Sequence, residues 1–94
     1  MKISSLQWDD INLEHIIAKH GFSPKEVEDV CFGPHYAFPA KYSRKAIFGK
    51  ATSGKYIMVV LKRLYNSVYR PITARGMKKN EIRKYRMIMG QGGS

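Results

Sequence analysis

The feature that most constrains the fold is an unbroken apolar run over residues 56–61, Tyr-Ile-Met-Val-Val-Leu. A strand with one face in water alternates apolar and polar side chains, and this run does not alternate. It therefore predicts a central strand that is buried on both faces. Because the run is too short to cross a bilayer, we place it in the sheet of a globular domain and expect no membrane partner.

Four segments with the composition of strands follow one another, at residues 35–40, 45–50, 55–63 and 68–74. Short turns at residues 52–54 and 65–67 separate the last three, and turns this short favour antiparallel neighbours. Pro39 and Pro71 cannot donate a hydrogen bond to a neighbouring strand. We therefore expect their strands to be edges or to be bulged at these positions.

Two helices are predicted before the sheet, after a short strand within residues 3–8. Asp9 or Asp10 caps the first helix, and Gly21 ends it. Ser-Pro-Lys-Glu at residues 23–26 begins the second helix. The serine is a cap, the proline fits the first helical position, and the glutamate completes a capping box.

A last helix is predicted over residues 77–89, with Ile82 and Tyr85 on its packing side. Residues 90–94, Gly-Gln-Gly-Gly-Ser, have the composition of a flexible tail. The prediction is therefore a single α+β domain over residues 1–89: an antiparallel sheet with N-terminal helices and a C-terminal helix.

The charge is divided unevenly along the chain. Residues 1–40 hold three Lys and six acidic residues, whereas residues 41–94 hold 14 Lys or Arg and a single acidic residue, Glu81. Like charges repel one another within a small domain, so fold stability does not explain the excess of basic residues in the second half of the chain. Nucleic acid is the usual partner of such a surface, and an acidic protein is the next. A basic surface that serves only solubility is the third interpretation.

The cysteine, the histidines and the N-terminal residues bear on disulfides, metal sites and location in the cell. The single cysteine, Cys31, excludes an internal disulfide and a thiol-rich zinc site, and we expect it to be a buried apolar residue. The three histidines lack metal-ligand spacing, so we predict no metal and no cofactor. The first residues lack the apolar block of a secretory signal, which predicts a cytoplasmic location.

Basic residues gather where the last strand meets the last helix. Arg75 and the two lysines that follow it flank a helix N-terminus, whose free amides already favour anions. Arg70 lies five positions earlier, so a regular strand would put the two arginines on opposite faces, and a bulge at the intervening proline would bring them together. Two interpretations stay open: the arginines bind a phosphate, or Arg75 forms an internal ion pair, with Glu81 or Asp29.

Candidate acid–base groups come mainly from the first helix. His20 ends that helix in line with Ile16, which predicts a half-buried ring, while His15 and Lys19 share the other side. A histidine at a helix end also serves as a cap, so a structural role for His20 stays open. Tyr85 of the last helix is a further candidate, although packing suits it better. Other cations are candidate contacts to nucleic acid: Lys62, Arg63, Lys78, Lys79 and Arg83.

Several short motifs occur in a specific order. In the first half they are Trp-Asp at 8–9, Glu-His-Ile at 14–16, Lys-His-Gly at 19–21 and Ser-Pro-Lys-Glu-Val-Glu at 23–28. In the second half they are Tyr-Arg-Pro-Ile-Thr-Ala-Arg at 69–75 and the segment 81–85. In this order and spacing the motifs resemble those of the BrnT-like toxins, and together they span most of the chain. The sequence departs from the family pattern at Ile16, Gly76 and Lys78.

The resemblance implies a fold similar to that of RelE-type ribonucleases and a role as the toxin of a type II toxin–antitoxin system. Such a toxin cleaves RNA without a metal and so inhibits translation. Arg70 and Arg75 would hold the scissile phosphate, and the acid and base would come from His20, Lys19, His15 and Tyr85. The implied partner is an antitoxin, a small DNA-binding protein whose complex with the toxin binds operator DNA. Without the antitoxin, a homodimer is the implied state.

Two other functions fit the same features. One is a catalytically inert module that binds nucleic acid or an acidic protein, and salt-dependent RNA binding without a product would favour it. The other is a structural subunit whose basic face an acidic protein covers. That subunit would have little affinity for RNA and would form a stable complex with its partner.

Overall fold

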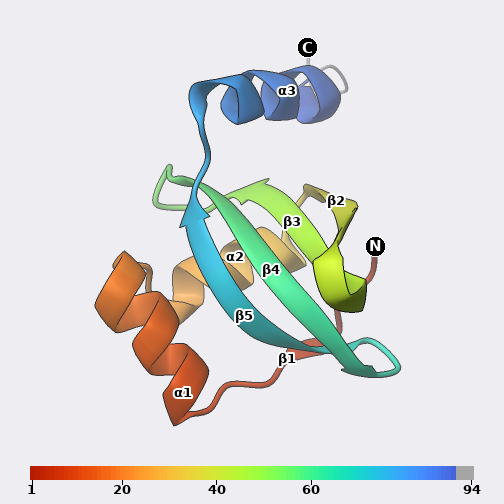
Figure 1. Cartoon of the computed structure of the whole chain (residues 1–94). Coiled ribbons are helices and arrows are strands. Elements are labelled where there is room, and N and C mark those ends of the chain that lie inside the picture. Colours follow the sequence, from red (N-terminus) through yellow and green to blue (C-terminus); the bar gives the residue numbers. More distant parts are fainter. Residues whose placement is uncertain (91–94) are drawn as a thin grey trace.

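The computed structural model describes residues 1–90, so the predicted tail lies, from residue 91 on, outside the described residues. In chain order the elements are β1 (Ser5–Leu6), α1 (Asp10–Leu13), the π-helix η1 (Glu14–Lys19), α2 (Pro24–Phe32), β2 (His35–Ala40), the 3-10 turn η2 (Lys41–Ser43), β3 (Arg44–Lys50), β4 (Tyr56–Tyr65), β5 (Val68–Gly76) and α3 (Lys79–Gly90). Figure 1 shows α2 against one face of the sheet, α1 beside β5, and α3 beyond the end where β5 leaves the sheet.

The sheet confirms the predicted α+β class. Its five strands lie in the order β1-β5-β4-β3-β2, and β2 to β5 form the expected antiparallel meander. The short strand β1 pairs with β5 in parallel, which makes the sheet mixed. Within residues 1–90, no helix is long and apolar enough to cross a membrane.

Both prolines lie where a missing donor is tolerated, as predicted. Pro39 is in β2, an edge strand. At Pro71 the register between β4 and β5 shifts: Val60 pairs with Thr73, and Leu61 pairs with Pro71, so one β5 residue between them has no partner. A bulge of this kind changes which residues share a face of the strand. Arg70 and Arg75 therefore lie on the same face, although their odd spacing would separate them on a regular strand.

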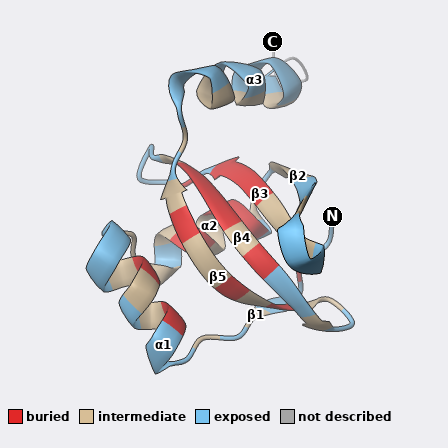
Figure 2. Ribbon diagram, in the orientation of Figure 1, coloured by how far each residue is buried: buried red, intermediate tan, exposed pale blue. Residues whose placement is uncertain are grey.

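The main core lies between the sheet and the N-terminal helices. Ile16 of η1 and Val27 and Val30 of α2 are fully buried against Ile47 and Val59 of the sheet (Figure 2). Burying a side chain of this size stabilises the fold by about 1.5–3 kcal/mol before entropy is subtracted. Cys31 also belongs to this core, and burial raises the pKa of its thiol to about 12, as expected for an inert apolar residue.

The central strand β4 is buried on both faces along only part of its length. Ile57, Val59 and Leu61 are fully buried in the core, and Met58 on the opposite face is only 9% exposed. Val60, on the same side as Met58, is only half-buried. The prediction therefore holds near α3, which covers one end of this second face, and it is wrong further along the strand, where no helix lies over it.

The first helix differs from its prediction. Asp9 is the cap, as expected, and its carboxylate accepts hydrogen bonds from the amides of Ile11 and Asn12. The helix then changes from α to π geometry over Glu14–Lys19. A π-helix closes i→i+5 hydrogen bonds, so residues five apart become neighbours on its surface. Apolar spacing alone did not indicate this change.

The helix α3 is attached at the surface, and none of its residues is buried. The helix contacts the sheet mainly through Tyr85. The centre of the Tyr85 ring lies 6.0 Å from that of Tyr36 and 5.8 Å from that of Tyr56. Lys84 lies over the ring of Phe38. Tyr85 thus packs the helix against the sheet, which was the structural role that suited it better.

Asn12 attaches the first helix to the sheet, and a substitution at this position tests that attachment. It is the one buried polar residue within residues 1–90, and its amide donates to the carbonyl oxygens of Gln7 and Pro71. We expect Asn12→Ala to lower the free energy of unfolding by about 1–3 kcal/mol, because it leaves buried carbonyl groups without a donor. Chemical denaturation measures this loss.

The matched control is Ile11→Ala at the adjacent, largely exposed position. It should change the free energy of unfolding by less than about 0.5 kcal/mol. Equal losses for the two variants would contradict the anchoring role of Asn12.

Candidate functional site

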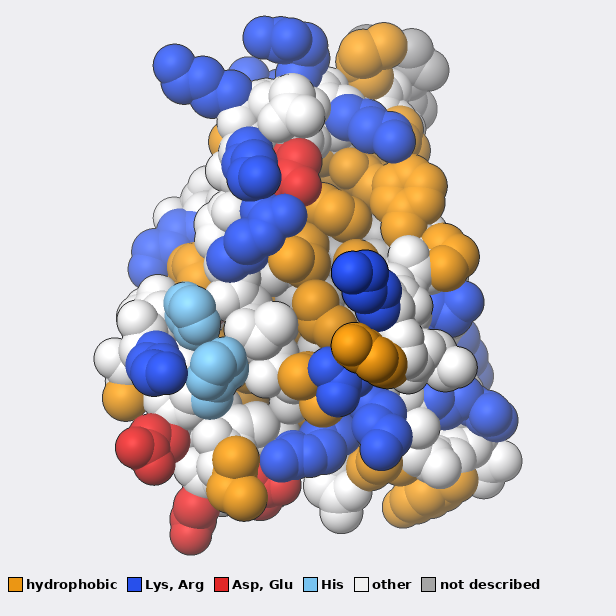
Figure 3. All heavy atoms as spheres, viewed as in Figure 1, with side chains coloured by type: hydrophobic (Ala, Val, Ile, Leu, Met, Phe, Trp, Pro, Cys, Tyr) orange, Lys and Arg blue, Asp and Glu red, His pale blue; other side chains and the backbone are white. Residues whose placement is uncertain are grey.

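One face of the sheet is only partly covered. The core helices pack against the other face, and α3 lies over one end of this one (Figure 1). Figure 3 shows this side of the molecule: apolar side chains form a band down its middle, Lys and Arg side chains lie on both sides of the band and across its lower part, and two His side chains lie together to its left. We call the uncovered part the open face. By strand alternation it comprises Arg44, Ala46, Val60, Lys62, Arg70 and Thr73.

Three cations cross the open face as a row, one from each of three neighbouring strands. Lys62 of β4 pairs directly with Arg70 of β5. Arg44 of β3 lies beside Lys62, because the next residue of β3 pairs with Leu61. Strands lie about 4.8 Å apart, and like charges at that spacing repel each other. In the part of the chain that the structure describes, neither Arg44 nor Lys62 forms an ion pair with a carboxylate. We call these three residues the cation row.

An open pocket of about 480 Å³ lies beside Arg70 at the end of the cation row. His15, Arg70 and Thr73 supply polar side chains to its lining, and Ile11 and Ile72 are among the apolar residues there. The Nε2 atom of His15 forms a 3.1 Å hydrogen bond with the Thr73 hydroxyl group, which holds the imidazole at the pocket. The volume is within the range of about 300–1,000 Å³ that is usual for small-ligand sites.

The two histidines of the first helix lie next to each other. The rings of His15 and His20 are in an edge-to-face arrangement with their centres 5.0 Å apart. The residues are five positions apart, so the π geometry of η1 is what makes them neighbours. His20 is exposed, so the prediction of a half-buried ring is wrong: the π turns move it away from the row of Ile16. A neutral imidazole can accept a proton and a protonated one can donate it, so an adjacent pair can supply both a base and an acid.

Arg70 is held by one carboxylate but stays at the pocket. Its Nη1 atom lies 3.0 Å from Oδ2 of Asp9, and its Nη2 atom donates to Oδ1 at 3.3 Å. The Nη1 atom is buried and has no partner in hydrogen-bonding geometry within residues 1–90. The Asp9 carboxylate is also engaged as a helix cap, so it is shared between two tasks. Arg70 is therefore positioned and only partly neutralised.

Arg75 forms the internal ion pair, which was the second of the two interpretations that the sequence left open. Its guanidinium group forms two hydrogen bonds with Glu81, of 2.7 and 2.8 Å, and a third with the carbonyl oxygen of Gly76. Glu81 also accepts from the amide of Lys78, which joins the end of β5 to the start of α3. Arg75 thus has the internal ion pair in place of a free guanidinium group, and we assign it to the attachment of α3.

The remaining predicted residues do not converge on the cation row. Lys19 lines a smaller pocket on the outer side of the first helix. Arg63 alternates to the other side of β4 from Lys62 and donates to the carbonyl oxygen of Asn66. Burial raises the pKa of Tyr85 above its ordinary value, which makes its hydroxyl group a weaker acid. Lys78 is exposed at the start of α3.

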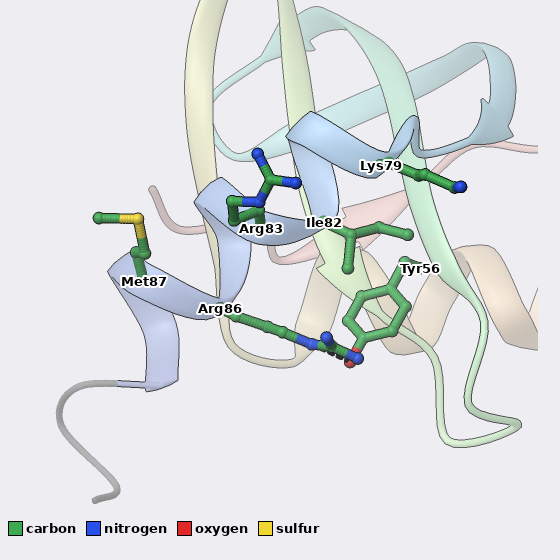
Figure 4. A pocket seen from close by; sticks show the side chains of 6 residues that line it. All are labelled: Tyr56, Lys79, Ile82, Arg83, Arg86 and Met87. Atoms are coloured by element: carbon green, nitrogen blue, oxygen red, sulfur yellow. Dashed lines mark hydrogen bonds between the residues drawn. The ribbon is translucent and has the colours of Figure 1, made fainter.

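Another pocket, of about 590 Å³, lies against α3. Lys79, Arg83 and Arg86 surround an apolar wall of Ile82 and Met87, and Arg86 donates a 3.2 Å hydrogen bond to the Tyr56 hydroxyl oxygen. Figure 4 shows that the head groups of Lys79 and Arg83 point away from Tyr56 and from each other. One compact anion cannot contact all three cations. This pocket is therefore a charged, partly apolar surface whose side chains do not converge on one point where a reaction could be catalysed.

Two residues of this region, Arg44 and Thr73, were not predicted from the sequence. Strand alternation could have identified Arg44, because it lies two and four positions before Ala46 and Phe48 and so shares their face of the sheet. It was not identified because the strand was expected to begin one residue later. Thr73 becomes relevant only through its contact with His15, which depends on how the first helix packs beside β5. Among residues 1–90, no three His, Cys, Asp or Glu side chains are close enough to hold a metal ion.

No family model matches the sequence, and no curated protein is significantly similar to it.

The ion pair between Arg75 and Glu81 predicts a pH-dependent attachment of α3. Hydrogen bonding to Arg75 lowers the pKa of Glu81 from 4.5 to about 2. The ionised carboxylate therefore stabilises the fold fully above about pH 4.5, and this contribution disappears as the pH falls toward 2. At pH 7 we expect Glu81→Gln to cost about 1 kcal/mol or less, because the Arg75 side chain is 38% exposed.

Hydrogen exchange of the α3 amides in the wild type and in Glu81→Gln, at pH 7 and near pH 2, measures this effect. The difference in protection should be clear at pH 7 and should vanish near pH 2. Glu14→Gln, at an exposed position, is the control. A difference that persists unchanged at the lower pH would contradict the assignment.

Proposed function

We propose that the open face binds single-stranded RNA and that the pocket beside Arg70 cleaves it. The observation that supports this most directly is the cation row, which ends at a pocket lined by a histidine. A row of like charges is unfavourable without an anion, and a ribose-phosphate chain supplies anions at regular spacing. The apolar band between the charges offers a surface for bases.

The proposed chemistry uses the RNA as its own nucleophile. The 2′-hydroxyl oxygen forms a bond to the adjacent phosphorus, the bond from phosphorus to the 5′ oxygen breaks, and a 2′,3′-cyclic phosphate results. One imidazole of the His15–His20 pair takes the 2′ proton, and the other donates a proton to the leaving 5′ oxygen. Arg70 stabilises the charge that develops on the phosphate oxygens, an effect worth about 3–4 kcal/mol for a well-placed donor.

The wider biological role rests on the resemblance to BrnT-like toxins. We propose that the chain is the toxin of a toxin–antitoxin pair, that cleavage of RNA inhibits translation in the cytoplasm, and that its partner is a small DNA-binding antitoxin. The confirmed fold class is compatible with this role but is not specific for it, because one fold can carry many functions.

A second function, the binding of an acidic protein, is supported by the surface of α3. The pocket there combines three cations with exposed apolar side chains, including Met87, and has no acidic residue in its lining. Charges of one sign around an apolar centre favour a partner of opposite charge. This surface lies apart from the cation row, so one molecule can use both.

Cleavage of a single-stranded RNA by the purified protein, in the presence of a chelator, tests the proposed reaction. We expect products that end in a 2′,3′-cyclic phosphate. Arg70→Ala and His15→Ala should each lower the rate by about 100-fold or more, through lost charge stabilisation and lost proton transfer. Arg75→Ala should change the rate far less, because Arg75 already binds Glu81.

Lys25→Ala is the charge control, since Lys25 is an exposed lysine on α2. Equal cleavage by the wild type and Arg70→Ala would remove Arg70 from the site. Salt-dependent RNA binding without any product would support the inert binding module instead.

A further inference from the structure

The turn η2, between β2 and β3, holds an exposed aromatic ring in an unusual backbone conformation. Tyr42 has φ 61° and ψ 37°, and Ser43 has φ 58°, so two consecutive residues are left-handed. Bulky side chains rarely adopt this region, and glycine is the residue that takes it without strain. Such strain is retained where surrounding structure or function requires it.

Packing does not account for the ring. Tyr42 is 83% exposed, the highest value among the large exposed hydrophobic residues that the structure describes. Its one ring contact within residues 1–90 is with Arg44, whose guanidinium carbon lies 5.7 Å from the ring centre. Tyr36 and Phe48, on this side of the sheet, stack on each other, and α3 lies over them through Tyr85, so these two rings are not free to bind a ligand. Phe38 beside them is 39% exposed, about half the value of Tyr42, and Lys84 lies over its ring.

The contact with Arg44 connects the ring to the cation row. Arg44 is the end of the row away from Arg70, so the ring and the pocket lie at opposite ends of the same line of charge. A nucleotide whose phosphate binds Arg44 therefore carries its base toward the ring. Every base has an aromatic face, so stacking on a tyrosine tolerates any sequence.

We propose that Tyr42 is a stacking platform for a base of single-stranded RNA, at the end of the cation row away from the pocket. This inference rests on the proposed function, because it takes RNA as the ligand of the cation row. Tyr42 is a binding residue here and takes no part in the chemical step. The strained turn keeps the ring out of the core and beside Arg44.

Tyr42→Gly separates this role from a structural one. Glycine removes the ring and also relieves the left-handed backbone, so the midpoint of thermal unfolding should not fall. The probe is a short fluorescent oligoadenylate with 2′-O-methyl groups, which cannot be cleaved. We expect Tyr42→Gly to raise its Kd by about tenfold at low salt. Tyr42→Trp should restore wild-type binding, because it keeps an aromatic face.

Inorganic polyphosphate, which has the charge but no bases, is the second probe. Its Kd should be unchanged in Tyr42→Gly and should rise in Lys62→Ala. The control is Phe32→Ala, which removes an exposed ring from α2, the helix that packs against the opposite face of the sheet. This variant should leave both Kd values unchanged.

Two results would overturn the inference while the proposed function stands. In the first, Tyr42→Gly binds oligoadenylate as tightly as the wild type, while Lys62→Ala binds it more weakly. In the second, Tyr42→Gly weakens the binding of polyphosphate and RNA equally, which means that the ring acts only through Arg44. A wild-type protein that binds neither probe would overturn the proposed function, and this inference with it.

Discussion

Repulsion among three cations on an uncovered sheet face is the constraint around which this molecule is arranged. Arg44, Lys62 and Arg70 occupy neighbouring strands at one level of the sheet, and only Arg70 has a carboxylate partner among the described residues. A fold selected for stability alone would place opposite charges across this row. The sheet tolerates the row because its other face is sealed by a well-packed core, which supplies the stability that the open face does not.

The two arginines of β5 show how one structural irregularity produces two different roles. The bulge at Pro71 brings Arg70 and Arg75 to the same face. Glu81 then neutralises Arg75 through two hydrogen bonds of 2.7 and 2.8 Å and fastens α3, whereas Asp9 holds Arg70 less completely, through one hydrogen bond of 3.3 Å and a 3.0 Å contact outside hydrogen-bonding geometry. A cation with two short bonds to its own carboxylate is a poor ligand for a phosphate. The candidate site is therefore centred on Arg70, and it is smaller than a site containing both arginines.

The meander was predictable because its signals are local. The apolar run of β4, the alternation in its neighbours and the short turns fix the strands within a few residues, and the prolines indicate an edge and a bulge. Three features of the site were not predictable in this way. The π geometry that joins His15 to His20 leaves no mark in apolar spacing, and Arg44 was hidden by an error of one residue in the start of β3. The choice of Glu81 as the partner of Arg75 had a visible alternative in Asp29, and only tertiary structure decided between them.

The central claim is that RNA lies across the open face, and backbone amide chemical shifts measured during titration with an uncleavable RNA test it most directly. We expect shifts that saturate and that cluster on β3, β4 and β5 around Arg44, Lys62, Arg70 and Thr73, together with a change at His15. These shifts should weaken as salt is added. Shifts confined to α3, or none at any residue of the cation row, would contradict the claim.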